Sequence, residues 1–426
     1  MLKILVVNDS FPNINNRTTI LFKNIIPKLS EKFKIKIYWI ITDEHDRKYN
    51  EENPNYEILF LSDFNNALEV LEKVKPDISY HIIGFNIMEY AFNLTEKFLK
   101  IPNFGYADSD ASDYFLMETS KSKMVLEYVK QFFDKKGIDG KSEKMRGVNF
   151  LKKYLFLIKT FYAIGYSYKK IVLEFLKLEI GVRRSVKFNE KFNCDLMFVE
   201  NSKSLEFHVK SGLKRENLKV CGNTSFYNAF QKREKLPKLT SGKLNVLFLT
   251  ANFSNQGKSD WSKSRRNEMV KELEKEFEGK SEKISFSIKI HPASENIIQY
   301  KKLLKPNSHI HVIQKDDVFE LISKSDIVIT PCTSTAAIIS LIMKKPIIIW
   351  NYFNIKNDLL LREKMVLECK KSSELVNNLE KAKIFRIKNE EKIEEKIKNE
   401  FVDEEPIQKY VNELEEWIQK IKVEKK

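Results

Sequence analysis

The sequence predicts an α/β protein made of two doubly wound parallel sheets. Short β-branched or aromatic runs alternate with segments of helical periodicity, and this alternation occurs twice along the 426 residues. A charged stretch at 231–243, which contains Pro237 and Gly242, separates the two series and is predicted to be a linker. With 42% hydrophobic residues, a chain of this length can build two cores.

The first series predicts an N-terminal Rossmann-like domain over 1–230. Its expected strands lie at 3–8, 35–41, 56–61, 77–83, 195–200 and 218–223, with helices at about 19–32 and 65–73 and from about 202–204. The stretch 137–184 departs from this pattern, because it mixes aromatic and aliphatic residues with Lys and Arg at helical spacing. This composition is typical of interfacial helices, and core-packing helices are the alternative.

The second series predicts a C-terminal Rossmann-like domain over 244–383. Its expected strands lie at 244–250, 285–290, 309–314, 326–331 and 346–350, with helices at about 263–277 and 335–343 and one ending near 323. From 384 to 426 the sequence is charge-dense, and its spaced apolar residues predict amphipathic helices.

The charge balance indicates anionic partners. The formal charge of +15 comes from 74 Lys and Arg against 59 Asp and Glu, so phospholipid, nucleic acid or a nucleotide-linked substrate would be attracted. Surface lysines without a specific partner are the alternative reading. No nucleic-acid-binding module is recognisable, so we expect no nucleic-acid partner.

The terminal and cysteine patterns indicate a cytoplasmic protein. The apolar run after Met1 is too short for a signal peptide and predicts a strand, and no run reaches the length of a membrane span. The four cysteines are far apart and lack zinc or redox spacing, so we expect neither disulfides nor structural metal. If the 137–184 helices touch a bilayer, the protein would be peripheral on the inner face of the cell membrane.

Two motifs in the second series point to a phosphate site. Pro292 ends a strand because it lacks an N–H, which puts His291 at the carboxyl edge of the sheet, where ligands bind in open α/β folds. Thr333, Ser334 and Thr335 follow another strand and precede a helix, whose first N–H groups and dipole attract anions. Singly, the first motif is an ordinary strand end and the second an ordinary N-cap. Together on one sheet they favour a donor-phosphate site.

This pairing of motifs resembles the bacterial GT-B sialyltransferases and capsule polysialyltransferases. It is also similar to the CDP-glycerol glycerophosphotransferases and, more distantly, to UDP-N-acetylglucosamine 2-epimerases. Gly212, Gly222 and Asn223 match a turn, strand and Gly-Asn pair that often closes the first domain of these families, but Thr224 and Tyr227 replace the usual proline and aspartate. The resemblance covers roughly 187–351 well. Over the first 180 residues, only the expected architecture is similar.

The resemblance implies a GT-B fold whose two domains face a central cleft, with the nucleotide-sugar donor in the second half and the acceptor in the first. It implies a glycosyltransferase of polysaccharide biosynthesis that moves a CMP-linked nonulosonic acid to a surface glycan or lipid-linked acceptor. The 2-epimerases usually carry Ser-Gly-Gly in their phosphate loop. This sequence has Ser334-Thr335-Ala336, which favours the transferases.

An inverting transferase needs a general base for the acceptor. The candidates are Asp108, Asp110 and Asp113, which follow a short strand-like run. A turn with Asx caps is the alternative, and three acids also resemble a metal site, but no second ligand cluster accompanies them. We therefore expect a metal-independent enzyme without a cofactor.

Other candidates follow further strands of the two series. On the acceptor side these are Asp9, Ser10 and His81, although His81 stands in an apolar run that favours a core position; on the donor side they are Asn252 and Ser254.

Two alternatives to this function stay open. One is an epimerase-like enzyme or a UDP-sugar or CDP-glycerol transferase. The other is a non-catalytic GT-B-like protein that binds membrane or polymer.

Overall fold

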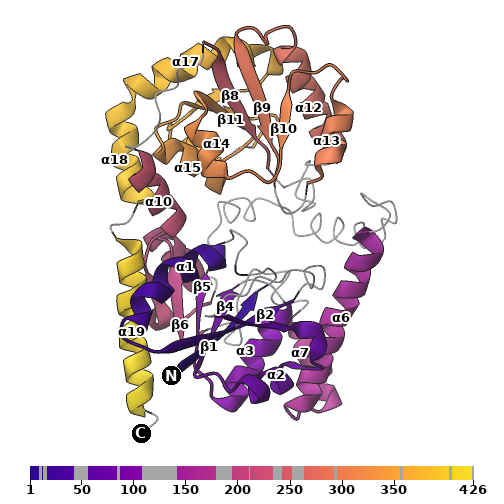
Figure 1. The fold of residues 1–426 in the computed structure, drawn as a ribbon, viewed down its shortest axis with the longest axis vertical. Coiled ribbons are helices and arrows are strands. Elements are labelled where there is room, and N and C mark those ends of the chain that lie inside the picture. The colour runs from indigo at the N-terminus through magenta and orange to yellow at the C-terminus, as the bar shows by residue number, and fades with distance from the viewer. Residues whose placement is uncertain are drawn as a thin grey trace. The chain divides into compact units, whose positions relative to one another are not determined.

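A computed structural model gives the fold of the chain (Figure 1). It describes residues 1–8, 12, 17–42, 56–83, 87–107, 142–178, 194–210, 212–233, 242–251, 263–291, 295–355, 358–402 and 405–424. These residues form two compact units: the first lies within 1–109, 135–224 and 404–426, and the second within 225–403.

The first unit contains a seven-stranded parallel sheet in the order β3-β2-β1-β4-β5-β6-β7. Its strands are β1 (Leu2–Asn8), β2 (Ile35–Ile41), β3 (Tyr56–Phe60), β4 (Ile78–Ile83), β5 (Asn103–Ala107), β6 (Leu196–Val199) and β7 (Leu218–Val220). The order reverses between β1 and β4, which creates the switch point where ligands bind in such sheets.

Helices cover both faces of this sheet. They are α1 (Arg17–Ser30), α2 (Ala67–Val74), α3 (Ile87–Leu99), α6 (Ser142–Ala163), α7 (Tyr168–Leu176), α9 (Ser202–Lys210) and α19 (Pro406–Glu424), with short 3₁₀ turns at Leu61–Asp63 and Arg215–Asn217. Alternating residues of β1 separate the two cores: Leu5 and Val7 pack with α2, α3, α6 and α7, whereas Ile4 and Val6 pack with α1 and α19.

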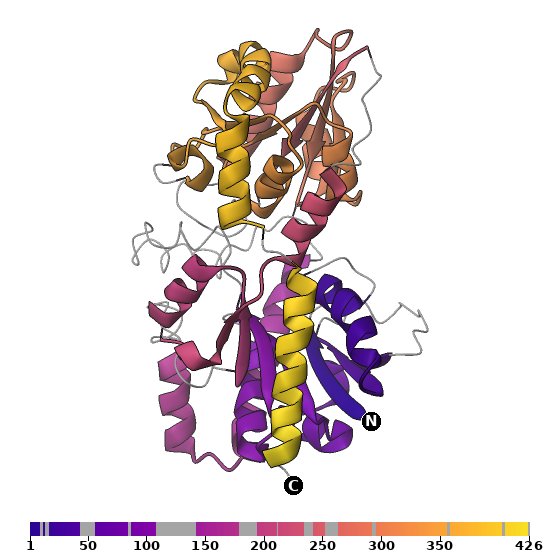
Figure 2. The ribbon, with the colours of Figure 1, turned by 90° about the vertical axis from the view of Figure 1, so that its left-hand side faces the viewer.

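Helix α19 joins the first unit although the whole second unit precedes it in the sequence. Figure 2 shows it lying along this sheet. Leu414 and Ile418 are buried there, and the hydroxyl of Tyr410 donates to the carbonyl of Gly222 at 3.0 Å. Gly222 has a φ of +84°, a left-handed conformation that glycine adopts without strain, so the predicted Gly-Asn turn also provides the docking carbonyl for α19.

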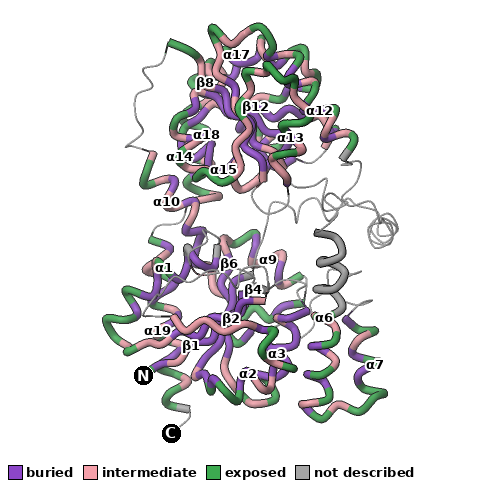
Figure 3. Tube along the Cα trace, turned by 45° about the vertical axis from the view of Figure 1, so that its right-hand side comes forward, coloured by how far each residue is buried: buried purple, intermediate pink, exposed green. Residues whose placement is uncertain are grey.

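The second unit contains a six-stranded parallel sheet in the order β10-β9-β8-β11-β12-β13. Its strands are β8 (Leu244–Leu249), β9 (Ile284–Lys289), β10 (His311–Ile313), β11 (Ile327–Thr330), β12 (Ile347–Trp350) and β13 (Leu367–Cys369). The switch point lies between β8 and β11. Most core-facing strand residues are buried (Figure 3).

The helices of the second unit also form two layers. They are α10 (Thr224–Lys232), α12 (Lys263–Phe277), α13 (Ile297–Leu303), α14 (Val318–Ser323), α15 (Thr335–Ile342), α16 (Leu359–Arg362), α17 (Leu375–Lys388) and α18 (Glu390–Glu400), with a 3₁₀ turn at Ser372–Glu374. One core lies against α12, α13 and α17, and the other against α10, α15 and α18. Two parallel sheets with helices on both faces confirm the predicted α/β class.

The 137–184 stretch contains two helices where the structure describes it. α6 buries Phe156, Leu157 and Phe161 in the core beneath α2 and α3, so the inner side of this helix packs in the core, and an interfacial role for its outer side stays a prediction. Among the residues described, no helix is both long enough and apolar enough to cross a bilayer.

Candidate functional site

His291 stands directly after β9, at the carboxyl edge of the second sheet. The N–H of Ile290 still donates to the carbonyl of Ile313 in the neighbouring strand at 2.9 Å. The N–H of His291 turns away from the ladder and donates to Glu295 Oε2 at 2.7 Å and Thr250 Oγ1 at 3.1 Å. The side chains of Glu295 and Thr250 thus fix the backbone position that carries the half-buried imidazole.

Glu295 is the centre of this arrangement. Its carboxylate also accepts hydrogen bonds from the hydroxyls of Thr250 and Tyr300, and its carbonyl accepts from Gln314 Nε2 at 2.6 Å. Glu295 is 5% exposed and Tyr300 is fully buried. Burial, with the adjacent Glu295 carboxylate, raises the pKa of Tyr300, so this phenol remains protonated and acts as a donor.

Electrostatics keep the His291 imidazole neutral in the isolated protein near pH 7. Burial lowers the pKa of His291; Glu295 opposes this shift and Lys289 adds to it. Burial also lowers the pKa of Lys289, whose ammonium donates to the carbonyl of Gln314 at 2.6 Å and to that of Ile290 at 3.2 Å. Lys289 and His291 therefore form a basic pair at the end of β9. An anion bound beside them would raise the pKa of both groups and so favour their charged forms.

The amino terminus of α15 lies at the same edge, after β11. Ser334 is the N-cap: its backbone is extended and its hydroxyl accepts from the N–H of Ala337 at 3.2 Å. The N–H groups of Thr335 and Ala336 belong to the first turn, where an α-helix offers no internal acceptor. Ser334 and Thr335 are half-buried, so this helix start is accessible to an anion.

Thr333 has a different position from its two neighbours. It is 1% exposed, and its hydroxyl donates to Asp358 Oδ1 at 2.6 Å and accepts from the N–H of Leu360 at 3.1 Å. Its own N–H donates to Asp358 Oδ2 at 2.6 Å. The side chain of Thr333 is thus committed to Asp358, the N-cap of α16, and shapes the loop that presents Ser334.

The two motifs flank the central strand β8. Phe248 of β8 pairs with Ile288 of β9 on one side and with Ile329 of β11 on the other, so the three strands end nearly level. With a strand spacing of about 4.8 Å, the ends of β9 and β11 lie about 10 Å apart. Thr250, which follows β8, lies between them.

Most other candidates from the sequence lie outside the described residues. They are Asp9, Ser10, Asp108, Asp110, Asp113, Asn252, Ser254 and Pro292. Their assigned roles stay predictions. In the sequence, Asp9 follows β1 and Asp108 follows β5 directly.

His81 lies on β4, and the structure places it in the core of the first unit. It is 1% exposed, and its Nε2 lies 2.7 Å from Oε2 of the equally buried Glu96. Asn103 Nδ2 donates to the same Glu96 oxygen at 2.9 Å. His81 is therefore part of a buried polar network, as its apolar sequence surroundings indicated, and its acceptor-side role stays a prediction.

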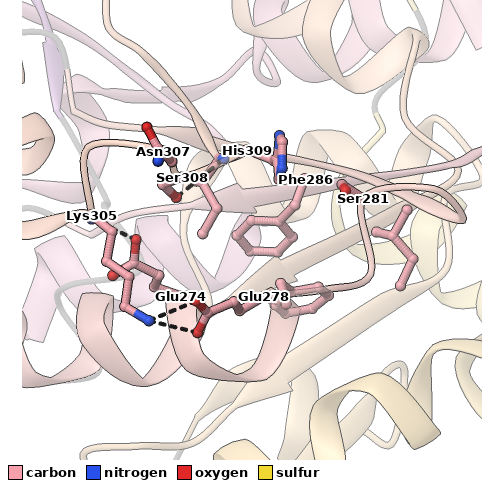
Figure 4. Close-up of a pocket in the computed structure, with 11 residues that line it drawn as sticks. Glu274, Glu278, Ser281, Phe286, Lys305, Asn307, Ser308 and His309 are labelled. Carbon is pink, nitrogen blue, oxygen red and sulfur yellow. Dashed lines mark hydrogen bonds and ion pairs between the residues drawn. The ribbon is translucent and has the colours of Figure 1, made fainter.

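The second unit contains a hollow of about 90 Å³, whose lining residues are drawn in Figure 4. The rings of Phe277 and Phe286 stack in its wall with centroids 4.0 Å apart, and Lys305 and Glu278 form an ion pair beside it at 2.6 Å. Ile284, another lining residue, begins β9, whereas His291 follows the end of that strand. The length of the strand puts roughly 20 Å between them. The hollow is therefore not part of the candidate phosphate site.

Three residues that matter to this site were not identified from the sequence: Glu295, Tyr300 and Asp358. The available signal for Asp358 was its place before an apolar turn, typical of an N-cap. Glu295 precedes the N-cap Asn296 of α13, and nothing in its spacing shows that it reaches back to His291.

No protein-family model and no curated protein matches this chain. Among solved structures, it is similar to S. aureus MnaA in complex with UDP, with a TM-score of 0.54, 13% identity and coverage of 98% of this chain and 97% of that one. It is similar to the H548A variant of the wall teichoic acid polymerase TagF, with a TM-score of 0.55, 11% identity and coverage of 100% and 90%. A UDP-GlcNAc 2-epimerase of Neisseria meningitidis bound to UDP-GlcNAc gives a TM-score of 0.49 and 15% identity over 90% and 93%.

The first two matches span nearly the whole chain and show its fold. Together with the strand orders, they confirm the predicted GT-B architecture of two Rossmann-like units. At this identity they show the fold alone. The sialyltransferase type expected from the sequence remains a proposal.

Proposed function

We propose that this protein is a GT-B transferase that uses a nucleotide-activated donor and binds the donor phosphate in its second unit. One observation carries the proposal: His291 and the Ser334-capped start of α15 lie at the same sheet edge, on either side of β8. Either motif alone is common in α/β proteins. Their placement at one edge of the sheet, on either side of β8, would offer both a basic side chain and a set of oriented N–H groups to one anion.

The described residues can stabilise a leaving nucleotide. As the bond to the transferred group breaks, negative charge grows on the phosphate oxygens, and preorganised donors lower the energy of that state. The Ser334 hydroxyl accepts from Ala337 N–H, which leaves its own proton free to be donated to a phosphate oxygen. His291 would donate through its imidazole, and its proton affinity would rise beside a phosphate.

The acceptor would be activated from the first unit. We propose that one of Asp108, Asp110 and Asp113 takes the proton of the acceptor hydroxyl, with Asp9 and Ser10 nearby on the acceptor side. The supporting observation is that β1 and β5 are both neighbours of β4 in the parallel sheet, so these two strands end at the same edge. No step in this scheme requires a metal ion or a cofactor.

The donor proposed from the sequence is a CMP-linked nonulosonic acid, transferred to a glycan or lipid-linked acceptor. A UDP-linked or CDP-glycerol donor is the second candidate, because the similar structures are MnaA with UDP and a wall teichoic acid polymerase. An epimerase-like reaction on a UDP-sugar would use the same phosphate site but no acceptor. A donor-only assay separates these reactions, because only the epimerase would change the sugar without an acceptor.

A thermal-shift panel with CMP, CDP, UDP and GDP tests the donor site. A ligand that binds only the folded protein raises the melting temperature, and we expect this shift in the wild-type chain but not in His291→Ala. His311→Ala is the matched control, since His311 is an exposed histidine of the same unit on edge strand β10. No shift with any nucleotide, or an equal shift in His291→Ala, would refute the proposed site. The absence of a shift with any of the four nucleotides would favour a non-catalytic role.

A further inference from the structure

The outer surface of α6 and α7 is unusual for a protein face exposed to water. Six of the large apolar side chains of this hairpin are more than 40% exposed, which is half of those found among the described residues. They are Leu155 55%, Tyr162 56%, Tyr168 71%, Val172 41%, Leu173 51% and Leu176 49%. We call these six residues the hairpin face; Figure 3 shows much of α7 as exposed.

The hairpin is firmly built into the first unit, so its exposure does not come from a loose attachment. Tyr154 of α6 contacts Phe175 of α7, with ring centroids 5.1 Å apart. The buried Glu174 of α7 accepts from the hydroxyl of Tyr90 in α3 at 3.1 Å. Gly165, with a φ of +79°, makes the turn between the helices. The inner sides of both helices are therefore committed to the core, and the outer sides are held in a defined orientation.

The apolar residues lie in stripes and alternate with lysines. On α6, Lys152, Leu155, Lys159 and Tyr162 are all exposed and follow one another at helical spacing on one side. On α7, Tyr168, Val172 and Leu176 stand four residues apart, and Leu173 lies beside them. Each stripe is thus a continuous surface.

The charge on this surface has one sign. Residues 152–178 contain six lysines and one glutamate, with no aspartate or arginine. The glutamate is Glu174, which is 3% exposed and engaged by Tyr90 and Lys177. Within residues 152–178, every charge except that of the buried Glu174 is therefore positive.

We propose that the hairpin face lies on an anionic lipid bilayer. Its leucines, valine and tyrosines would enter the boundary between headgroups and acyl chains, and Lys152, Lys159, Lys169 and Lys170 would meet lipid phosphates. A second copy of the chain is a poor occupant, because it would bring lysines against lysines. This inference does not depend on the proposed reaction, although it would place the first unit beside a lipid-linked acceptor.

Flotation of the full-length protein with vesicles tests the inference. The probes are vesicles of phosphatidylcholine alone and of phosphatidylcholine with 30% phosphatidylglycerol, roughly the surface charge of an anionic leaflet. We expect the wild-type protein to bind the anionic vesicles, and to be released as salt is raised. Equal binding to both vesicles, or no binding to either, would overturn the proposal.

Two sets of substitutions locate the surface. The variant Tyr168→Ser/Leu173→Ser/Leu176→Ser should bind anionic vesicles at least about tenfold more weakly. The variant Lys152→Gln/Lys169→Gln should bind anionic vesicles about thirtyfold more weakly, because each lysine near an anionic membrane surface strengthens binding by a similar factor. Phe98→Ser is the matched control, because Phe98 is a 56% exposed apolar residue of α3 in the same unit. Retained binding in either hairpin variant would overturn the proposal.

Two further readouts separate the alternatives. All three residues of the serine variant are exposed, so its melting temperature and its nucleotide response should match the wild type. Loss of vesicle binding with an intact nucleotide response would support the hairpin face independently of the donor site. If the wild-type protein is a dimer by light scattering and the serine variant a monomer, or if acidic polypeptides compete as well as anionic vesicles, the face serves a protein partner and the proposal fails.

Discussion

Replacing Thr333 with valine separates a structural role for this residue from a ligand-binding one. Valine has nearly the shape of threonine but carries a methyl group in place of the hydroxyl. The hydroxyl that would be lost donates to Asp358 at 2.6 Å and accepts from the N–H of Leu360 at 3.1 Å, in a region where both Thr333 and Asp358 are at most 2% exposed.

The expected loss can be worked from these two bonds. A hydrogen bond to a carboxylate contributes about 1.5–3 kcal/mol, and leaving the Leu360 N–H without its acceptor costs about 1 kcal/mol more. We therefore expect the free energy of unfolding of the second unit to fall by about 3 kcal/mol. For a unit the size of 225–403, this corresponds to a melting temperature about 6–12 °C lower.

Differential scanning calorimetry of the full-length chain measures this loss, with Thr330→Val as the matched control. Thr330 is fully buried three residues earlier, and its hydroxyl donates to the neutral carbonyl of Cys332 at 2.9 Å. Its loss should be about 1 kcal/mol. If Thr333→Val leaves the melting temperature unchanged but abolishes the nucleotide response, then the hydroxyl binds the donor directly and the structural reasoning is refuted.

Three further outcomes are expected. Ser334→Ala should cost about 1 kcal/mol through the lost N-cap and should also weaken the nucleotide-induced thermal shift; an unchanged shift would remove Ser334 from the site. Because burial lowers the pKa of His291, the unfolded chain binds more protons there, so its contribution to stability is present above about pH 6.5 and is lost as the pH falls through that value towards the folded pKa. His291→Gln should therefore show a shallower decline in melting temperature below pH 6.5, and an identical pH profile would contradict this. Leu414→Ala should destabilise the first unit by about 2–5 kcal/mol, seen as a lower melting transition for that unit alone, and a shift confined to the second unit would argue against the docking of α19.

The strands of both sheets were largely predictable, because buried parallel strands are nearly continuous apolar runs. The runs at 35–41 and 346–350 correspond to β2 and β12 within one residue at each end. Strand β13 was not predicted, since its three residues, Leu367–Cys369, are too few to show a pattern. Amphipathic helices after 384 were predicted, but apolar spacing does not state which core a helix covers. α18 packs in the second unit and α19 in the first.

The candidate site was predictable as two motifs but not as a network. The strand end at His291 and the N-cap at Ser334 follow from local rules about proline and capping. The groups that hold them depend on the folded chain: Asp358 reaches Thr333 across 25 positions, and Glu295 folds back to accept from the N–H of His291. Such contacts between distant or turned-back residues leave no periodic signal in the sequence.

The docking of α19 on the first sheet has a consequence for biosynthesis. Translation delivers the strands of that sheet first, yet Tyr410, Leu414 and Ile418 of its core follow only after residues 225–403 have been made. The described residues of the second unit all lie within 225–403 and can complete their cores without waiting, so the part made later should be the first to reach its native state on the ribosome. Nascent chains that end before residue 405 should therefore carry an unfinished apolar face, and should depend most on chaperones at that stage.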